Sequence, residues 1–502
     1  MSENTAPQRL PLASAAAAVV VMAGLVSLFA TYWDDAWHTD IGRDDALIPP
    51  HLLLYGSVAV VGLVVAGWGL LALWRTRSLI AVLRRPPLLI AGIGGLVTLA
   101  SAPADAWWHE VFGRDSVLWS PSHMLTVFST LALIGGVLAG LRPAAPLPLW
   151  WAGGALLLGS AVMSVLEFET DVPQFSEALY LPVLLVASMY VAILLRALSP
   201  DRHLVAGAVV VYVLARLVIS VLLAAMGRTV PDLPLAVIGL AAIDLPWRRP
   251  FIAYAAGAAG VAATTLLSAG VGLSSVSFDA VLGPAAVVLI GFCGVLLLMG
   301  RRARGAAAVA LLLGLSVPVL VPKPASAHDP GQGQIVGTAV LTAGSDGAGT
   351  VTLTVEGCVN LTPQRIVARR AGQEIAGPLT QLTGGCRSSG QVRVDPAGMW
   401  FLYAELRDPN GTVETWLPVE TEDRASVRQT RPIYIPAGTA RVTAGQIAAG
   451  AGLYVIGLFM LSLTVYLVRR GHRRPDVGRR GIANRPTPPT STWAAGATRR
   501  SP

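Results

Sequence analysis

Runs of about twenty apolar residues recur along most of this chain and constrain its fold more than any other feature. A run of that length crosses a hydrocarbon core of about 30 Å as a single helix. Apolar residues make up 54% of the 502 residues and charged residues only 13%, which excludes an ordinary soluble globular chain. The sequence therefore predicts a polytopic α-helical membrane protein with about 12 spans, in contact with the lipid bilayer.

The arginines predict how these spans are oriented. They gather in alternate connections and in the C-terminal tail, whereas the other connections carry acidic residues. Basic connections stay in the cytoplasm, so we expect a multi-pass plasma-membrane protein with both termini cytoplasmic. The formal charge of +8 is then explained by topology, and no nucleic-acid partner is expected. Arg216 falls inside a predicted span, where an unpaired charge is costly, and Glu167 is its expected partner.

A segment near the C-terminal end has a different pattern. Short β-rich runs between residues 328 and 440 alternate with Gly, Asp-Pro and Asn-Gly turns. This spacing predicts an antiparallel β-sandwich, placed outside the cytoplasm between the last two spans. Cys358 and Cys386 both lie in it, and an oxidising compartment favours a disulfide between them.

These patterns divide the chain into six parts. They are a duplicated two-helix repeat (1–141), six further spans (142–304), a signal-like span or cleavage segment (305–327), the extracytoplasmic β-sandwich (328–440), a C-terminal span (441–470) and a disordered basic tail (471–502).

One polar motif occurs twice, at the outer ends of the predicted spans. The first copy places Asp34 four residues before His38 and ends in Pro50-His51. The second copy repeats this order and ends in Pro-Ser-His, with one more residue in the connection. Its corresponding residues are Asp105, His109 and His123. Residues four apart share a face of a helix, and a histidine beyond the connection can complete a three-ligand site.

The ligand types narrow the choice of metal. One carboxylate and two imidazoles suit copper, zinc or iron, whereas calcium and magnesium prefer oxygen ligands. The pairs Arg43-Asp44 and Arg114-Asp115 can supply charges that orient the ligands from outside the site. Alternatively, each pair is a salt bridge that only stabilises its loop. Neighbouring tryptophans offer a second interpretation, in which the motifs are aromatic membrane-boundary loops that share an ancestor and bind no metal.

The order Asp-x3-His, Arg-Asp, Pro-Ser-His resembles the metal-binding segment of the C subunit of particulate methane and ammonia monooxygenases. The resemblance covers roughly twenty residues of each copy. It implies that Asp34, His38 and His51, and likewise Asp105, His109 and His123, bind copper or zinc at the membrane. Here the motif is doubled, and the span count exceeds that of the subunit.

His328 follows the small-residue end of the signal-like segment, Ala325-Ser326-Ala327. This arrangement is similar to the B subunit of those monooxygenases and to periplasmic copper carriers of the CopC type, in which a cupredoxin-like sandwich begins at a histidine exposed by signal cleavage. The resemblance implies that His328 is a further metal ligand if the bond before it is cut. The segment from 328 to 440 contains no other histidine, so such a site needs ligands from elsewhere.

Three functions follow from these observations. The first is a copper-binding membrane protein for extracytoplasmic copper acquisition, transfer or delivery, with copper carriers or other membrane subunits as partners. The second is a single-chain relative of the copper membrane monooxygenases, so the sequence leaves open whether the protein is an enzyme. The third is a metal-free assembly protein. Neither a nucleotide-binding loop nor a CxxC or CxxCH motif is found, which disfavours ATP-driven transport and haem attachment.

Overall fold

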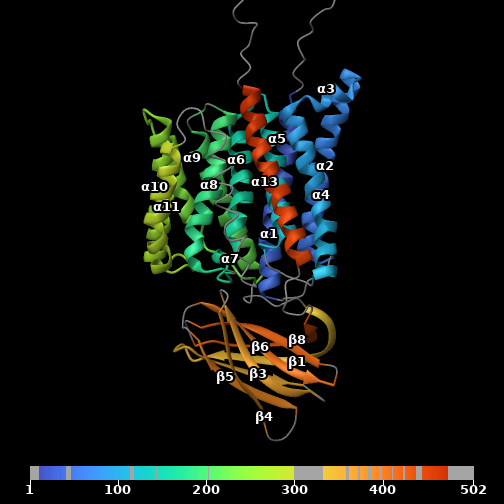
Figure 1. Cartoon of the computed structure of the whole chain (residues 1–502), viewed down its shortest axis with the longest axis vertical. Coiled ribbons are helices and arrows are strands. Elements are labelled where there is room, and N and C mark those ends of the chain that lie inside the picture. The colour runs from blue at the N-terminus through green and yellow to red at the C-terminus, as the bar shows by residue number, and fades with distance from the viewer. Residues whose placement is uncertain are drawn as a thin grey trace, which may run out of the picture.

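The computed structural model places an all-helical body beside a separate antiparallel β-barrel (Figure 1). The described residues are 11–40, 47–112, 118–142, 144–173, 175–199, 201, 203–298, 332–357, 361–370, 373–382, 386–394, 398–409, 411–421, 424–436 and 444–472.

The helical body consists of fifteen described helical elements in chain order. These are α1 (Ser14–Asp40), α2 (Pro49–Thr76), α3 (Leu79–Leu83), α4 (Pro86–Phe112), α5 (Pro121–Ala139), α6 (Leu147–Val162), η1 (Met163–Val165), α7 (Leu166–Glu169), η2 (Glu177–Leu179), α8 (Tyr180–Leu198), α9 (Leu204–Ala225), η3 (Leu235–Asp244), α10 (Pro250–Gly270), α11 (Phe278–Leu298) and α13 (Ala444–His472).

Nine helices in the described part of the chain are long and apolar enough to cross a membrane, which indicates a multi-pass membrane protein. Among the six further spans predicted between 142 and 304, the apolar stretch Leu235–Asp244 is the ten-residue 3-10 helix η3, which is not among the nine. The apolar stretch counted for α11 is also shorter, Phe278–Gly294. The signal-like segment 305–327 lies outside the described residues, so the total of twelve stays a prediction.

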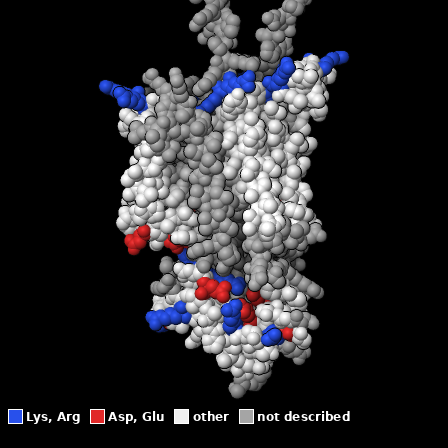
Figure 2. Space-filling view, in the orientation of Figure 1, with Lys and Arg blue, Asp and Glu red and all other residues white. Residues whose placement is uncertain are grey.

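Charge is distributed unevenly along the helical body. In Figure 2, the visible acidic side chains lie at the barrel end and on the barrel, whereas Lys and Arg side chains gather at the end of the helical body away from the barrel and also occur on the barrel. Arg75 in the last turn of α2 belongs to the far end, where α3 also lies. The segregation agrees with the alternation of basic and acidic connections in the sequence.

Two helical hairpins carry the repeated motif. Helix α1 pairs with α2 and α4 pairs with α5, and in each hairpin a proline begins the second helix. In the second hairpin the backbones approach closely, because a Cβ on Gly94 would lie 2.5 Å from Leu133 N and a Cβ on Gly136 would lie 2.3 Å from Ala91 N. Glycines at such positions let membrane helices pack closely.

Helix α13 returns from the barrel into the helical body and packs against α5 (Figure 1). Tyr454 of α13 donates a hydrogen bond of 2.6 Å to the main-chain oxygen of Trp119. The barrel is therefore joined to the helical body through the chain on both sides, between α11 and α13.

The β-domain is one sheet of eight antiparallel strands closed in the order β1-β2-β5-β4-β3-β6-β7-β8. The strands are β1 (Gln332–Ser345), β2 (Thr350–Glu356), β3 (Thr362–Arg370), β4 (Gln373–Gln381), β5 (Arg387–Arg393), β6 (Met399–Asp408), β7 (Gly411–Glu420) and β8 (Ser426–Pro436).

The predicted sandwich is replaced by this closed barrel, although the antiparallel pairing is as expected. Closure occurs where β8, already paired with β1, also meets β7 at the single register pair Glu414↔Tyr434. The alternation of apolar residues predicts individual strands, but it does not encode which strands pair to close a sheet. Cys358 lies outside the described residues, so its disulfide with Cys386 remains a prediction.

Strand β6 is buried on both of its faces, one against the barrel core and the other toward the helical body. Strand β2 alternates buried and half-buried residues, but β6 is buried almost throughout. Trp400 and Leu402 point into the barrel core, whereas Phe401 and Tyr403 belong to an outer aromatic cluster. Val172, just beyond α7 of the helical body, packs into that outer cluster. Both faces of β6 are thus covered.

Candidate metal site at the end of α1

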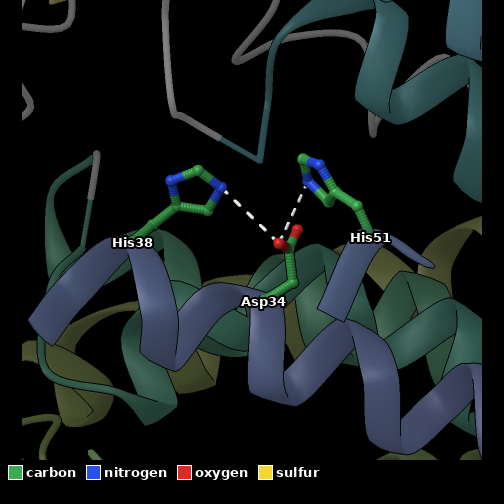
Figure 3. Close-up of side chains that lie close together, drawn as sticks. All are labelled: Asp34, His38 and His51. Atoms are coloured by element: carbon green, nitrogen blue, oxygen red, sulfur yellow. Dashed lines mark ion pairs between the residues drawn. The ribbon is translucent and has the colours of Figure 1, made fainter. Parts of the chain in front are cut away.

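Asp34, His38 and His51 converge at the barrel end of the first hairpin (Figure 3). Asp34 and His38 occupy the last two turns of α1, and His51 lies in the first turn of α2. The α1 helix continues to Asp40, so the spacing of four residues places both side chains on one helical face.

The three side chains meet at one carboxylate oxygen. Asp34 Oδ1 lies 3.1 Å from His51 Nε2 and 3.7 Å from His38 Nε2. One ligand atom from each residue falls within 4.8 Å of the other two. The side chains are largely shielded, with exposed fractions of 22% for Asp34, 18% for His38 and 15% for His51.

The environment of Asp34 fits a metal ligand. Its Oδ1 is buried, and among the described residues it accepts no hydrogen bond of ordinary geometry. A buried polar oxygen without a donor is unfavourable, and coordination of a cation removes that cost. The donor set of one carboxylate oxygen and two imidazole nitrogens suits copper or zinc.

The second hairpin repeats part of this geometry. Asp105 Oδ1 lies 3.3 Å from His123 Nε2, but His123 is 32% exposed, about twice as much as His51 in the first copy. His123 is also close enough to interact electrostatically with Asp34, so the two copies lie near each other. His109 belongs to α4, but its side chain lies outside the described residues.

The two copies differ at the residue before the final histidine. Ser122 Oγ donates a hydrogen bond of 2.6 Å to Asp105 Oδ1. The corresponding residue of the first copy is Pro50, which has no donor. Asp105 therefore accepts a serine hydrogen bond that has no counterpart at Asp34 among the described residues, which makes the first copy the better metal site.

Local sequence explains how the final histidines are placed. Ser120 accepts a hydrogen bond from His123 N and caps α5, and Pro121 follows at the first helical position. Serine caps and first-turn prolines are standard helix starts. In the first copy Pro49 and Pro50 begin α2, but Ile48 gives no side-chain cap. These prolines are visible in the sequence. Each marks the start of the second helix and so places the final histidine in its first turn.

Several predicted residues cannot be placed. The pairs Arg43-Asp44 and Arg114-Asp115 and the terminal candidate His328 all lie outside the described residues. Their predicted roles as ligand-orienting charges and as a further ligand stay predictions.

A second polar cluster lies deeper in the helical body. Arg216 of α9 is fully buried and forms a 2.7 Å ion pair with Glu169. It also donates hydrogen bonds to the hydroxyls of Tyr32 and Tyr212, at 2.6 and 3.0 Å, and to the main-chain oxygen of Asp232. The expected pairing with Glu167 is wrong, because Glu167 instead accepts a hydrogen bond of 2.7 Å from Leu118 N.

The barrel contacts the helical body on the same side as the metal candidate. Asp171, just after α7, accepts hydrogen bonds from the Arg370 guanidinium and from Met399 N. Burial in this interface raises the pKa of Asp171 to about 7, although Arg370 and the Met399 N–H act in the opposite direction.

Comparisons with protein-family models, with curated proteins and with solved structures find no match for this chain.

Proposed function

We propose that this chain is a copper-binding membrane protein that acquires, transfers or delivers copper at the extracytoplasmic face. The observation that carries the proposal is the convergence of Asp34, His38 and His51 around a buried carboxylate oxygen. Neutral imidazole nitrogens supply lone pairs, and the carboxylate offsets part of the cation's charge. Copper ranks above zinc for such a nitrogen and oxygen set.

The location of the cluster supports an exchange role. The ligands stand at the barrel end of the helices, with small exposed fractions that leave an approach for a metal ion. Basic side chains gather at the opposite end, and under the positive-inside rule this supports a location of the cluster and barrel outside the cytoplasm. A copper carrier or a membrane subunit on that side is the partner that fits.

The test is the metal content of the detergent-purified full chain. Wild type is compared with Asp34→Asn, His38→Ala and His51→Ala after exposure to Cu(II) or Zn(II) and removal of loosely bound ions. His203→Ala is the matched control, because His203 precedes α9 and lies away from the motif residues in sequence. We expect wild type and the control to retain the same amount of copper and each ligand variant to retain less.

A folded wild-type chain that retains neither copper nor zinc contradicts the proposal and favours the aromatic-boundary interpretation of the motifs. A loaded chain that also consumes dioxygen with a reductant and an organic substrate, and loses that activity in His38→Ala, favours the oxygenase hypothesis. The resemblance to the monooxygenase C subunit motivates this second assay.

A further inference from the structure

The last turn of α1, which bears His38, is held by the barrel. Arg431 of β8 donates a hydrogen bond of 2.7 Å from Nη2 to the main-chain oxygen of Asp40, the last residue of α1. Arg431 is 4% exposed, and its guanidinium lies 4.7 Å from the ring centroid of Trp416 on β7. The aromatic ring thereby fixes the direction from which the guanidinium reaches the helix.

The same turn is held from a second side by the connection between α9 and η3. The Asp40 carboxylate accepts hydrogen bonds from Thr229 N at 3.0 Å and from Thr229 Oγ1 at 2.5 Å. The neighbouring Arg228 lies over the ring of Trp37, 5.2 Å from its centroid. Asp40 therefore joins three elements: its own helix through the chain, β8 through its carbonyl and the α9–η3 connection through its carboxylate.

These contacts bear on the metal candidate because His38 is only two residues from Asp40. The carbonyls of a last helical turn have no partner within the helix, so an outside donor decides whether that turn stays ordered. His38 Nε2 is the more distant of the two imidazole nitrogens from Asp34 Oδ1, at 3.7 Å. A small shift of the turn thus moves one ligand relative to the other two, and outer groups that orient ligands strongly affect metal affinity.

We propose that Arg431 is a positioning residue for the Asp34/His38/His51 group, and that barrel docking and metal binding are therefore coupled. This inference rests on the proposed function. Coupling between two equilibria is reciprocal, so a metal ion at the group strengthens the contact of β8 with α1 to the same extent that the contact strengthens metal binding.

A separate anchor makes the inference testable, because the barrel does not depend on Arg431 alone. Asp171 holds Arg370 and Met399 N of the barrel, and Val172 packs against its aromatic face. Loss of the Arg431 donor should therefore loosen the α1 turn while the barrel remains docked.

The experiment measures Cu(II) affinity and the copper EPR spectrum of the full chain in detergent. Arg431→Met removes the donor but keeps an apolar side chain against Trp416, and Arg431→Lys restores a donor. Arg428→Met is the matched control, because Arg428 lies on the same strand, is 59% exposed and pairs with Glu356. We expect Arg431→Met to weaken affinity about 10- to 100-fold and to alter the spectrum, as outer-group variants do. Arg431→Lys should recover both, and the control should match wild type.

Hydrogen exchange of the wild-type chain provides a measurement that needs no variant. Copper should slow exchange of the β8 amides near Arg431, and leave those of β2, which does not pair with β8, unchanged. Unchanged affinity and spectrum in folded Arg431→Met, or unchanged β8 exchange on copper loading, overturns the coupling while the proposed function stands. If wild type itself retains no copper, the proposed function fails first.

Discussion

Asp105 Oδ1 lies 3.3 Å from His123 Nε2, close to the 3.1 Å between Asp34 and His51 in the other hairpin. These similar distances in two helical hairpins show that the repeated sequence produces a repeated Asp–His geometry. The repeat is imperfect at one atom, because Asp105 Oδ1 accepts a hydrogen bond from Ser122. This difference in hydrogen bonding allows the two copies to be distinguished by experiment.

The first prediction is that copper binds in two classes of different affinity. Ser122 competes for the Asp105 oxygen, so the second copy should bind the metal more weakly. Titration against a competing chelator should show the weaker class vanish in Asp105→Asn/His123→Ala and the stronger class vanish in Asp34→Asn/His51→Ala. Ser122→Ala should tighten the weaker class alone. A single class that survives His123→Ala excludes a metal role for the second copy.

The second prediction concerns the ion pair between Arg216 and Glu169. Both side chains are buried, with exposed fractions of 0% and 3%, so removal of one partner leaves a charge in an apolar interior. Glu169→Gln or Arg216→Met should each destabilise the folded chain by about 3–5 kcal/mol. Thermal unfolding in detergent measures the effect, with Glu356→Gln as a control because Glu356 is 28% exposed and pairs with the exposed Arg428.

The double variant Glu169→Gln/Arg216→Met should recover part of the loss, because no unpaired charge remains. Strictly additive losses in the double variant contradict an energetic link between the two residues. Normal copper retention in all three variants is expected if the cluster is structural.

The sequence predicted the helical character, the antiparallel β-domain and the residues that meet in the first hairpin. Helical spacing places Asp34 and His38 on one face, and the Pro-Pro start of α2 returns His51 to them, so the cluster follows from local rules. Closure of the barrel depends on which strands pair, and the contact of Arg431 with Asp40 joins residues 391 positions apart. No local pattern encodes such contacts.

The partner of Arg216 was missed for a related reason. The 3-10 turn Met163–Val165 interrupts the helix before Glu167 and Glu169. A 3-10 turn has three residues per turn instead of 3.6, so it rotates all later side chains relative to an unbroken helix. Which glutamate faces Arg216 therefore cannot be read from helical periodicity.

The third prediction is a pH dependence of barrel docking that Asp171 controls. Burial raises the pKa of this carboxyl to about 7, above its ordinary value, so the docked state holds its proton more tightly than the undocked state. The resulting stabilisation is present below the ordinary carboxyl pKa and is lost as the pH rises through about 7. Asp171→Asn should flatten this dependence.

Limited proteolysis of the full chain between pH 5 and pH 8 can measure it, scored by release of the barrel from the helical body. Wild type should release the barrel faster at the higher pH, and the difference between wild type and Asp171→Asn isolates this carboxyl from other titrating groups. Wild-type release that is slower at pH 8 than at pH 5 reverses the sign and contradicts the assignment.

The fourth prediction concerns Gly398, which lies between Asp171 and Arg370. Its φ of +82° favours glycine, and a Cβ there would meet Arg370 Nη2 at 2.3 Å and Asp171 Oδ2 at 2.5 Å. Gly398→Ala should therefore displace the ion pair that anchors the barrel, in addition to straining the backbone by about 1–3 kcal/mol.

Gly272→Ala is the matched control for backbone strain. Gly272 has a similar φ of +70°, but a Cβ there would meet nothing within 4 Å. Both variants should lower thermal stability, whereas only Gly398→Ala should speed proteolytic release of the barrel. Because Arg431 contacts α1 from the same barrel, Gly398→Ala should also weaken copper binding if docking and metal binding are coupled. Equal release rates in the two variants mean that backbone strain alone accounts for the effect, and that the Asp171–Arg370 anchor does not hold the barrel in place.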